Sequence, residues 1–429
     1  MPLSPLRVTD LPGRANRARP PAPRRSGRRL WPLLGPAFVA AVAYVDPGNF
    51  ATNFTGGASF GYTLLWVIAA ANLMAMLIQA LTAKLGLATG RDLASNCRER
   101  LPRPVTWGLW LQAEAVAIAT DLAEIVGGAV ALDLLLGVPL PVGGIITAVA
   151  AFVLLGAQSR GHRPFERVIA GLLLVIGAGF AYTLVDSGVD PSGVAAGLVP
   201  GFAGNESVLL ATGILGATVM PHVIYVHSAL TPGRYGDAVR EGATLVGRQR
   251  LLRAQRIDVL VAMGLAGLVN AAMLIIAAQL FTPGDGIESL QSVHQGIGAQ
   301  LGGGAALAFA LALLAAGFAS SSVGTHAGQV VMAGFLRRQV PVLARRLITL
   351  LPALLVLVIG VDPTTALVWS QVVLSFGIPF ALVPLLWLTS RRDLMGAWTN
   401  RRLTTLTGAV VAGLVIVLNG HLVVAVLLP

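Results

Sequence analysis

Two hydrophobic segments of the chain are interrupted by residues that could hold a metal ion. The first is broken at Asp46–Asn49, of sequence DPGN, and the second at Met220–His222, of sequence MPH. Proline removes a backbone donor and glycine allows unusual dihedral angles, so both sequences predict an opening in a helix. Together the openings offer a carboxylate, an amide oxygen, a thioether and an imidazole, a set that suits a divalent transition metal.

The first break is the more polar of the two. Asp46 supplies a carboxylate and Asn49 an amide oxygen, in the middle of an apolar run. A carboxylate at membrane depth must be paired, coordinated or protonated, which indicates a ligand at this position. The alternative is that Asp46 caps a kinked helix, because Asp followed by Pro also begins helices well.

The second break places a thioether beside a proline. Unwinding at Pro221 would free backbone carbonyl groups near Ala217. A lone Met220 would be a core residue in most proteins, but opposite Asp46 it becomes a candidate ligand. A thioether offers nothing to Ca²⁺ or Mg²⁺, which prefer oxygen, and so favours a transition metal. His222 lies close enough to this site to titrate or to gate it.

Three carboxylates share one face of the predicted helix 104–136. Glu114, Asp121 and Glu124 are separated by offsets of 7 and 10 residues from the first, which keeps them within about 80° on a helical wheel. Such a row in a membrane helix faces the bundle interior or a wet path, where it can relay protons. The alternative is that Asp121 and Glu124 form static pairs with Arg345 and Arg346, at the start of a later helix.

Composition identifies the chain as an integral membrane protein. Of its 429 residues 55% are hydrophobic and 11% charged, whereas soluble domains carry about 25% charged residues. Apolar runs of about 20 residues recur along the chain, each long enough to cross a bilayer. Cys97 is the only cysteine, which excludes an intramolecular disulfide and a cysteine-built metal site. Residues 1–30 are basic and proline-rich and do not resemble a cleaved signal peptide.

The net charge of +11 is distributed as in a membrane protein, not as in a nucleic-acid-binding one. The 30 lysines and arginines fall in seven places, separated by loops that carry neither. One such loop, 186–206, instead carries acidic residues. This alternation follows the positive-inside rule and predicts a cytoplasmic N-terminus and an extracytoplasmic C-terminus, in the cell inner (plasma) membrane. A nucleic-acid role would need a clustered basic footprint with matching motifs.

The alternation and the apolar runs predict an all-α fold with about eleven spanning helices. Gly and Pro interrupt the first, sixth and eighth of them. The 232–255 loop carries charges of both signs and is expected to form a short amphipathic helix. The predicted spans are 31–55, 62–86, 104–136, 139–157, 164–186, 206–231, 256–281, 297–335, 342–360, 364–390 and 403–428.

The two broken helices begin two blocks of five helices each. Because five is odd, the second block enters the membrane from the opposite side, which predicts a LeuT-like 5+5 inverted repeat. A break inside the membrane survives only where protein or a cavity covers it, and paired breaks are typical of the midplane site of a secondary transporter. We expect a basic cytoplasmic tail (1–30) and one transporter domain (31–429), made of two repeats (31–186 and 206–390) and an extra helix (403–428).

The same residues resemble the Nramp family of divalent metal transporters. The match comprises both break sequences, the TDLAE segment at Thr120–Glu124, the Gly324–Gln329 segment and Gln371. It covers roughly residues 31–390, and the two break sequences together make it specific. One departure is Ala333, where the family pattern suggests a larger polar or acidic side chain.

The resemblance implies a LeuT-like fold and the import of Mn²⁺ or Fe²⁺ together with protons. It implies that Gln371, whose default role is an interhelical hydrogen bond, joins the metal site in some conformations. The metal is then substrate and the proton the coupling ion, with no cofactor, no nucleic acid and no obligatory protein partner. The implied metal ligands are Asp46, Asn49, Met220, the Ala217 carbonyl and Gln371. The implied proton route passes Asp46, His222, Asp121 and Glu124 toward Arg345 and Arg346.

Two other functions compete with metal import. A cation-coupled transporter of an organic solute could use the same breaks, but Met220 adds little for a polar organic ligand. A membrane-embedded metalloenzyme would need an HExxH or a paired-histidine ligand set, which the sequence lacks. We therefore predict a transporter of Mn²⁺, with Fe²⁺ and Cd²⁺ as further substrates, and not an enzyme.

Overall fold

The polypeptide is helical throughout the part that the computed structural model describes, and no β-strand occurs in that part. The predicted tail at 1–30 lies outside it. The structure describes residues 35–159, 162–240, 245–282, 284, 287, 289–338 and 341–427. Within these ranges, the side chains left undescribed are those of 154–159, 162–166, 233–240, 245–248, 342, 343, 346, 426 and 427.

The first half of the chain contains the first broken helix and four long helices that follow it. Asp46 separates α1 from α2, while the glycines Gly90 and Gly137 end α3 and α5 in the left-handed conformation. The helices are α1 Pro36–Ala43, α2 Pro47–Phe60, η2 Gly61–Leu64, α3 Leu65–Thr89, α4 Leu93–Arg100, α5 Arg103–Leu136, α6 Leu140–Ser159, α7 His162–Ser187 and α8 Pro191–Gly197.

The second half begins with the second broken helix, which is interrupted at Val219 and Met220. It ends with α17, the predicted extra helix. The helices are α9 Asn205–Thr218, α10 Pro221–Arg240, α11 Leu245–Leu280, α12 Leu290–Leu301, α13 Gly303–Leu336, α14 Val342–Ile359, α15 Pro363–Ser390, α16 Arg392–Met395, η3 Gly396–Trp398 and α17 Arg402–Leu427.

All eleven predicted spans coincide with helices. Eight helical stretches among the described residues are long and apolar enough to cross a membrane, the first of them Pro47–Thr89, which joins α2, η2 and α3. The apolar parts of α6 and α14 within the described side chains, Leu140–Val153 and Leu347–Ile359, are shorter. The fold is thus an all-α membrane bundle, as predicted.

Two predicted boundaries are wrong. The span 297–335 is divided, because Gly302 adopts a φ of 88° and separates α12 from α13. The expected short amphipathic helix at 232–255 does not form as a separate element. Instead α10 continues to Arg240 and α11 begins at Leu245, so the membrane helices themselves extend through most of that loop.

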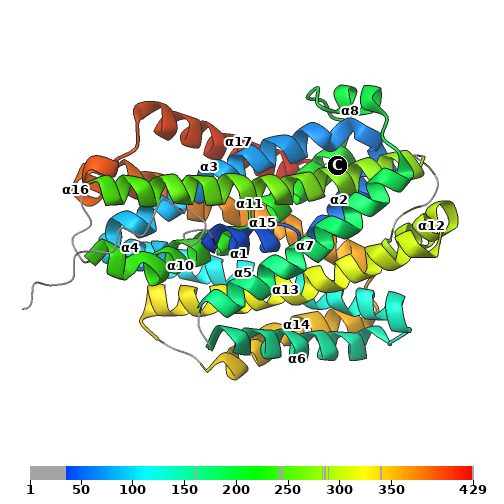
Figure 1. Cartoon of the computed structure of the whole chain (residues 1–429), viewed down its shortest axis with the longest axis horizontal. Helices are drawn as coiled ribbons and strands as arrows, with labels where there is room; N and C mark the ends of the chain where they lie inside the picture. Colours follow the sequence, from blue (N-terminus) through cyan, green and yellow to red (C-terminus); the bar gives the residue numbers. More distant parts are fainter. Residues whose placement is uncertain are drawn as a thin grey trace, which may run out of the picture. The chain divides into compact units, whose positions relative to one another are not determined.

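The short connecting helices mark the two ends of the bundle (Figure 1). α4 and α16 lie together at the left of the view, whereas α8 and α12 lie at the right. Arg100 and Asp393 approach to 3.6 Å, which brings the basic segments 91–103 and 391–402 to the same end. This grouping is what the alternation of charged loops requires.

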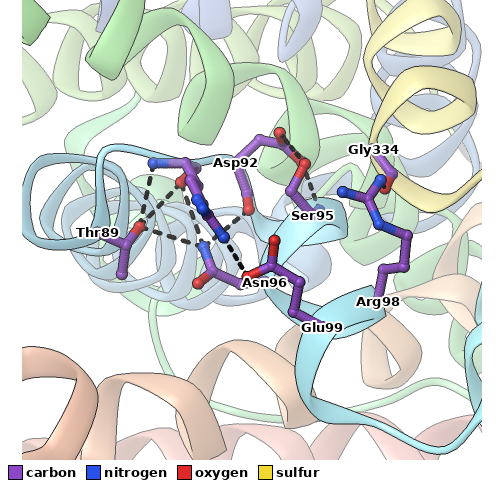
Figure 2. Close-up of polar contacts among 8 residues, drawn as sticks. Thr89, Asp92, Ser95, Asn96, Arg98, Glu99 and Gly334 are labelled. Atoms are coloured by element: carbon purple, nitrogen blue, oxygen red, sulfur yellow. Dashed lines mark hydrogen bonds and ion pairs between the residues drawn. The ribbon is translucent and has the colours of Figure 1, made fainter. Parts of the chain in front are cut away.

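At the basic end, α4 is fastened to the last turn of α13 (Figure 2). The Asp92 carboxylate caps α4 by accepting from the Ser95 amide at 2.7 Å and from its hydroxyl at 2.6 Å. The Arg98 guanidinium donates to the carbonyl groups of Ala333 and Gly334, two of the last acceptors of α13. A cation at this point also complements the negative end of the helix dipole.

The core and the lipid-facing surface are clearly distinct. The short helix α1 is almost entirely buried, with Val39 through Ala43 fully inaccessible. By contrast, apolar side chains on peripheral helices are exposed, for example Leu351 at 66% and Val417 at 70%. In a membrane protein these residues face lipid, so the broken helices lie in the protein interior as the predicted site requires.

Candidate metal-binding site

The first break is organised by a reciprocal pair of hydrogen bonds. Asp46 has extended backbone angles and precedes Pro47, the first residue of α2. Its Oδ1 accepts from the Asn49 amide at 2.8 Å, and the Asn49 Oδ1 accepts from the Asp46 amide at 3.4 Å. The capping interpretation of Asp46 is therefore correct in geometry. It leaves the second carboxylate oxygen, Oδ2, buried and without a hydrogen-bond partner among the described residues.

A buried amide on another helix supports the end of α1. The Asn270 Nδ2 of α11 donates to the Tyr44 carbonyl at 2.8 Å, just before the break. The Asn270 Oδ1 accepts from the Asn53 Nδ2 of α2 at 2.9 Å. One side chain therefore bridges both halves of the broken helix by hydrogen bonds between helices. It satisfies a backbone group that the break exposes.

At the second break, no hydrogen bond from a capping side chain is found among the described residues. α9 ends at Thr218, and Val219 takes φ −116° and ψ 68° before α10 begins at Pro221. Pro221 has no amide hydrogen to donate to the Ala217 carbonyl four residues earlier, so that oxygen lacks its usual helical donor. Met220 is 1% exposed and Ala217 is fully buried. The break therefore turns a thioether and a backbone oxygen into the protein interior.

Gln371 of α15 connects the two breaks. Its side-chain amide packs directly on Gly48, where an added Cβ would lie 1.9 Å from Nε2. Its backbone carbonyl packs on Gly216 of α9, again at 1.9 Å from an added Cβ. Glycine is required at both points because a side chain would displace Gln371. The structure thus brings Gln371 against residues adjacent to Asn49 and to Ala217.

Several buried polar atoms around the breaks lack hydrogen-bond partners within the described part of the chain. Buried polar groups are paired in the great majority of cases, and an unpaired one costs about 1–3 kcal/mol. A cluster of them therefore indicates a place that a ligand or water completes. The atoms are Asp46 Oδ2, Asn49 Nδ2, Thr218 Oγ1, His222 Nε2 and Gln371 Oε1.

The long helix α5 passes beside the first break and carries the predicted proton-relay residues. Its Gly127 abuts Pro47, since an added Cβ would lie 1.9 Å from the Pro47 Cβ. Two turns earlier, the Thr120 Oγ1 lies 3.2 Å from the His222 Nδ1 of α10. Thr120 is thus a contact between the two elements that sequence reasoning did not assign. Its position beside Asp121 was the available signal.

Two of the carboxylates of α5, those of Glu124 and Glu114, contact α13 and α14. Glu124 is fully buried, and its carboxylate oxygens lie 2.8 Å from where a Cβ on Gly324 of α13 would be. Glu114 forms a bidentate ion pair with Arg345, at 2.9 and 3.2 Å. Arg345 also donates to the Gly328 carbonyl of α13. Arg345 therefore pairs with Glu114, one of the three predicted carboxylates. The side chain of Arg346 is not among those that the structure describes.

From Gly127 to Glu114, α5 spans 13 residues, or roughly 20 Å of helix. Asp121, 5% exposed, lies on the same stretch. The predicted acids therefore lie along one stretch of α5, with Asp121 and Glu124 buried near the first break and Glu114 half-buried toward the basic end of the bundle. Such a line is what a proton route needs, because each carboxylate can bind and release a proton.

The sequence and the fold were compared with known proteins. A family model described as "Natural resistance-associated macrophage protein-like" matches residues 37–425. The chain belongs to the Nramp family. It is 52% identical over 401 residues to the divalent metal cation transporter MntH of Deinococcus radiodurans, covering 93% of this chain and 91% of the relative. Members of this family are transporters and not enzymes.

Solved structures agree with the family assignment. A crystal structure of the Eremococcus coleocola manganese transporter, in complex with an aromatic bis-isothiourea substituted compound, superposes with a TM-score of 0.82. It is 33% identical and covers 92% of this chain and 87% of that one. The nucleobase-cation-symport-1 transporter Mhp1 is only 18% identical but has a TM-score of 0.56, with 92% and 91% covered. The fold of this Nramp-family chain is therefore the LeuT-like one predicted from its sequence.

Two supporting features of this Nramp-family chain are not apparent in its sequence. Asp258 of α11 is fully buried and accepts from the amides of Gly35 and Ala37, both at 3.0 Å, which caps α1 from a distant helix. His227 Nδ1 lies 2.7 Å from Gln79 Oε1, and Gln79 also bonds Tyr44. This contact gives the buried His227 a structural role. Long-range contacts of this kind leave no periodic signal in the sequence.

Proposed function

We propose that this chain is a secondary active importer of Mn²⁺, with Fe²⁺ and Cd²⁺ as further substrates, coupled to protons and working by alternating access. Family membership and the names of the relatives support divalent metal transport in general. The observation that carries the specific proposal is the convergence of both helix breaks on Gln371. Gln371 contacts Gly48 beside Asn49 and Gly216 beside Ala217, which supports a site built from a carboxylate, two amides, a thioether and a backbone carbonyl.

The metal is held by groups that each break supplies. Asp46 uses Oδ1 to cap α2 and keeps Oδ2 for the ion, so the cap fixes the direction of the ligand. Asn49 and Gln371 supply amide oxygens, and Ala217 supplies the carbonyl that Pro221 leaves without a donor. Met220 completes the set with sulfur, which a Mn²⁺ or Fe²⁺ ion tolerates and a Ca²⁺ or Mg²⁺ ion does not use.

Protons move along the acidic row of α5. Asp46 and His222 lie at the metal end, and Asp121 and Glu124 continue the route. Glu114, paired with Arg345, forms its far end, and Arg346, the next residue in the sequence, is the second basic residue of the proposed route. Each proton that leaves a carboxylate restores a negative charge, which a neighbouring arginine stabilises. The route therefore runs beside the metal path and ends at the basic face of the bundle.

The charge distribution predicts the orientation of the chain in the membrane and the direction of transport. The basic ends of α4, α13 and α15 face the cytoplasm, so the N-terminus is cytoplasmic and the C-terminus extracytoplasmic. Metal enters from the acidic end, loses most of its water at the breaks and leaves toward the basic end. The membrane is the cell inner (plasma) membrane, where an inward proton gradient is available.

Transport of an organic solute is the weaker alternative. Asp46 and the open helix ends could bind an amine or a carboxylate, and Mhp1 shares the fold. The buried thioether of Met220 has no function in such a site. The arrangement of ligands around Gln371 therefore favours a metal ion.

Uptake of radioactive manganese into proteoliposomes, with a pH-sensitive dye inside, tests the proposed function. We expect Mn²⁺ uptake that increases with an inward proton gradient, accompanied by internal acidification that depends on Mn²⁺. Empty liposomes give the background. Absence of uptake under the gradient would refute metal import, and uptake without acidification would refute proton coupling.

A further inference from the structure

An apolar groove lies on the outside of the bundle, between α5, α15 and α17. It has a volume of about 720 Å³. Its walls include exposed side chains from all three helices, namely Val105, Phe380, Val383, Trp387 and Ile416. These side chains leave room for an apolar guest between fixed helices.

The groove has the length of one membrane leaflet. Along α15 its lining runs from Phe376 to Trp387, a separation of 11 residues, or roughly 16 Å. The hydrocarbon core of a bilayer is about 30 Å thick. An acyl chain lying in the groove would thus extend from the Trp387 end to near the bilayer centre.

At the end of the groove nearer the bilayer centre, hydrogen bonds join α15 to α17. Pro379 has no amide hydrogen for the Ser375 carbonyl, four residues earlier on α15. Asn419 of α17 replaces that donor, with its Nδ2 3.0 Å from the Ser375 carbonyl. The Ser375 hydroxyl in turn donates to the Asn419 Oδ1 at 2.9 Å. These bonds fix the spacing of the two helices that form the groove.

The outer end of the groove is basic. The Arg391 guanidinium lies 5.0 Å over the ring of Trp387, which itself lines the groove. Arg391 pairs with Asp393 at 2.9 Å and Arg100 approaches the same carboxylate at 3.6 Å. The hydrogen bond from Arg391 lowers the pKa of Asp393, which is therefore ionised. With exposed Arg392 also present, this end keeps an excess of positive charge.

We propose that the groove binds an anionic glycerophospholipid from the membrane leaflet that lies next to the basic loops. One acyl chain occupies the groove, and the phosphate is held by Arg391 and Arg100. Basic pockets between transmembrane helices at the cytoplasmic side select anionic head groups in this way. A zwitterionic lipid would present its own cation to the same arginines and bind less well.

Native mass spectrometry of the purified full chain tests this site. The protein is mixed with equal amounts of phosphatidylglycerol and phosphatidylcholine that carry the same acyl chains. We expect the phosphatidylglycerol adduct to exceed the phosphatidylcholine adduct by about fivefold. Equal binding of the two lipids to the wild-type protein would overturn the proposal.

Two sets of variants, one of arginines and one of valines, locate the effect. Arg391→Gln should reduce the preference for phosphatidylglycerol to near one, whereas Arg391→Lys and Arg337→Gln, whose side chain does not line the groove, should retain it. Val383→Trp should fill the groove and reduce both adducts, whereas Val410→Trp, at a lipid-facing position of α17 that is 53% exposed, should not. Thermal unfolding of each variant confirms that it is folded. An equal loss in Arg337→Gln or in Val410→Trp would refute the assigned site.

Discussion

Two polar regions of this protein, the half-buried junction between α4 and α13 and the fully buried helix breaks, are built differently. At the α4 junction, the Asp92 carboxylate is bonded through both oxygens and Asn96 donates to three oxygens around it. At the helix breaks, Asp46 and Gln371 each keep a buried oxygen without a hydrogen-bond partner among the described residues. In the first region the Asp92 carboxylate and the Asn96 amide find their partners within the protein, although the buried Arg98 Nε has none among the described residues. The second is complete only when something binds, which is why we place the substrate there.

The largest effect is expected from Asp46→Asn. Asparagine caps a helix about as well as aspartate, so the break should persist while the charged ligand is lost. We expect Mn²⁺ affinity to fall by on the order of 100-fold, since about 3 kcal/mol of charge attraction disappears. Isothermal titration with Mn²⁺ measures this.

Asp92→Asn is the matched control for that variant, because Asp92 caps α4 as Asp46 caps α2. It should leave Mn²⁺ affinity unchanged. An equal loss of Mn²⁺ affinity in both variants would refute the proposal that Asp46 binds the metal.

A smaller but still large effect is expected from Gly216→Ala. The new Cβ would lie 1.9 Å from the Gln371 carbonyl, so α9 and α15 must separate, at a cost of about 1–3 kcal/mol. We expect the rate of Mn²⁺ uptake to fall roughly tenfold. Gly413→Ala, where nothing lies within 4 Å of the added Cβ, should transport normally. Normal uptake by Gly216→Ala would show that contact with Gln371 is dispensable.

Met220→Ala is expected to change selectivity more than rate. The oxygen ligands remain, so Mn²⁺ uptake should largely persist, whereas competition by Ca²⁺ should increase several-fold. Because removal of a buried methionine also leaves a cavity, Met263→Ala on α11 serves as the control for lost packing. The measurement is Mn²⁺ uptake against increasing Ca²⁺. Unchanged competition would remove Met220 from the ligand set.

The smallest effect is expected from Asp92→Ala. Loss of the α4 cap should lower the free energy of unfolding by about 1 kcal/mol. Transport by the folded protein should stay as in the wild type, because α4 contributes no ligand. Thermal unfolding in detergent and uptake per folded molecule measure the two quantities. Loss of uptake without loss of stability would contradict the proposal that the α4 cap serves stability and the helix breaks serve transport.

Sequence and structure differ in what they reveal about this site. Apolar runs predict the helices, and the DPGN and MPH sequences predict both breaks, because proline and glycine act locally. An interruption of the span 297–335 was expected, but its position at Gly302 was not predicted, because glycines are frequent in membrane helices that do not break. The meeting of Gly48 and Gly216 on Gln371, and the cap that Asp258 provides to α1, depend on contacts between distant segments. Only the folded chain shows them.

The most direct test is the position of bound manganese. Crystals or frozen complexes prepared with Mn²⁺ should show one buried ion, identified by its anomalous scattering, within about 2.5 Å of Asp46 Oδ2 and near the Met220 sulfur and the Ala217 carbonyl. Density at that point in the wild type, and none in Asp46→Asn, is the expected result. A bound ion remote from both helix breaks would contradict the proposal that they form one metal site.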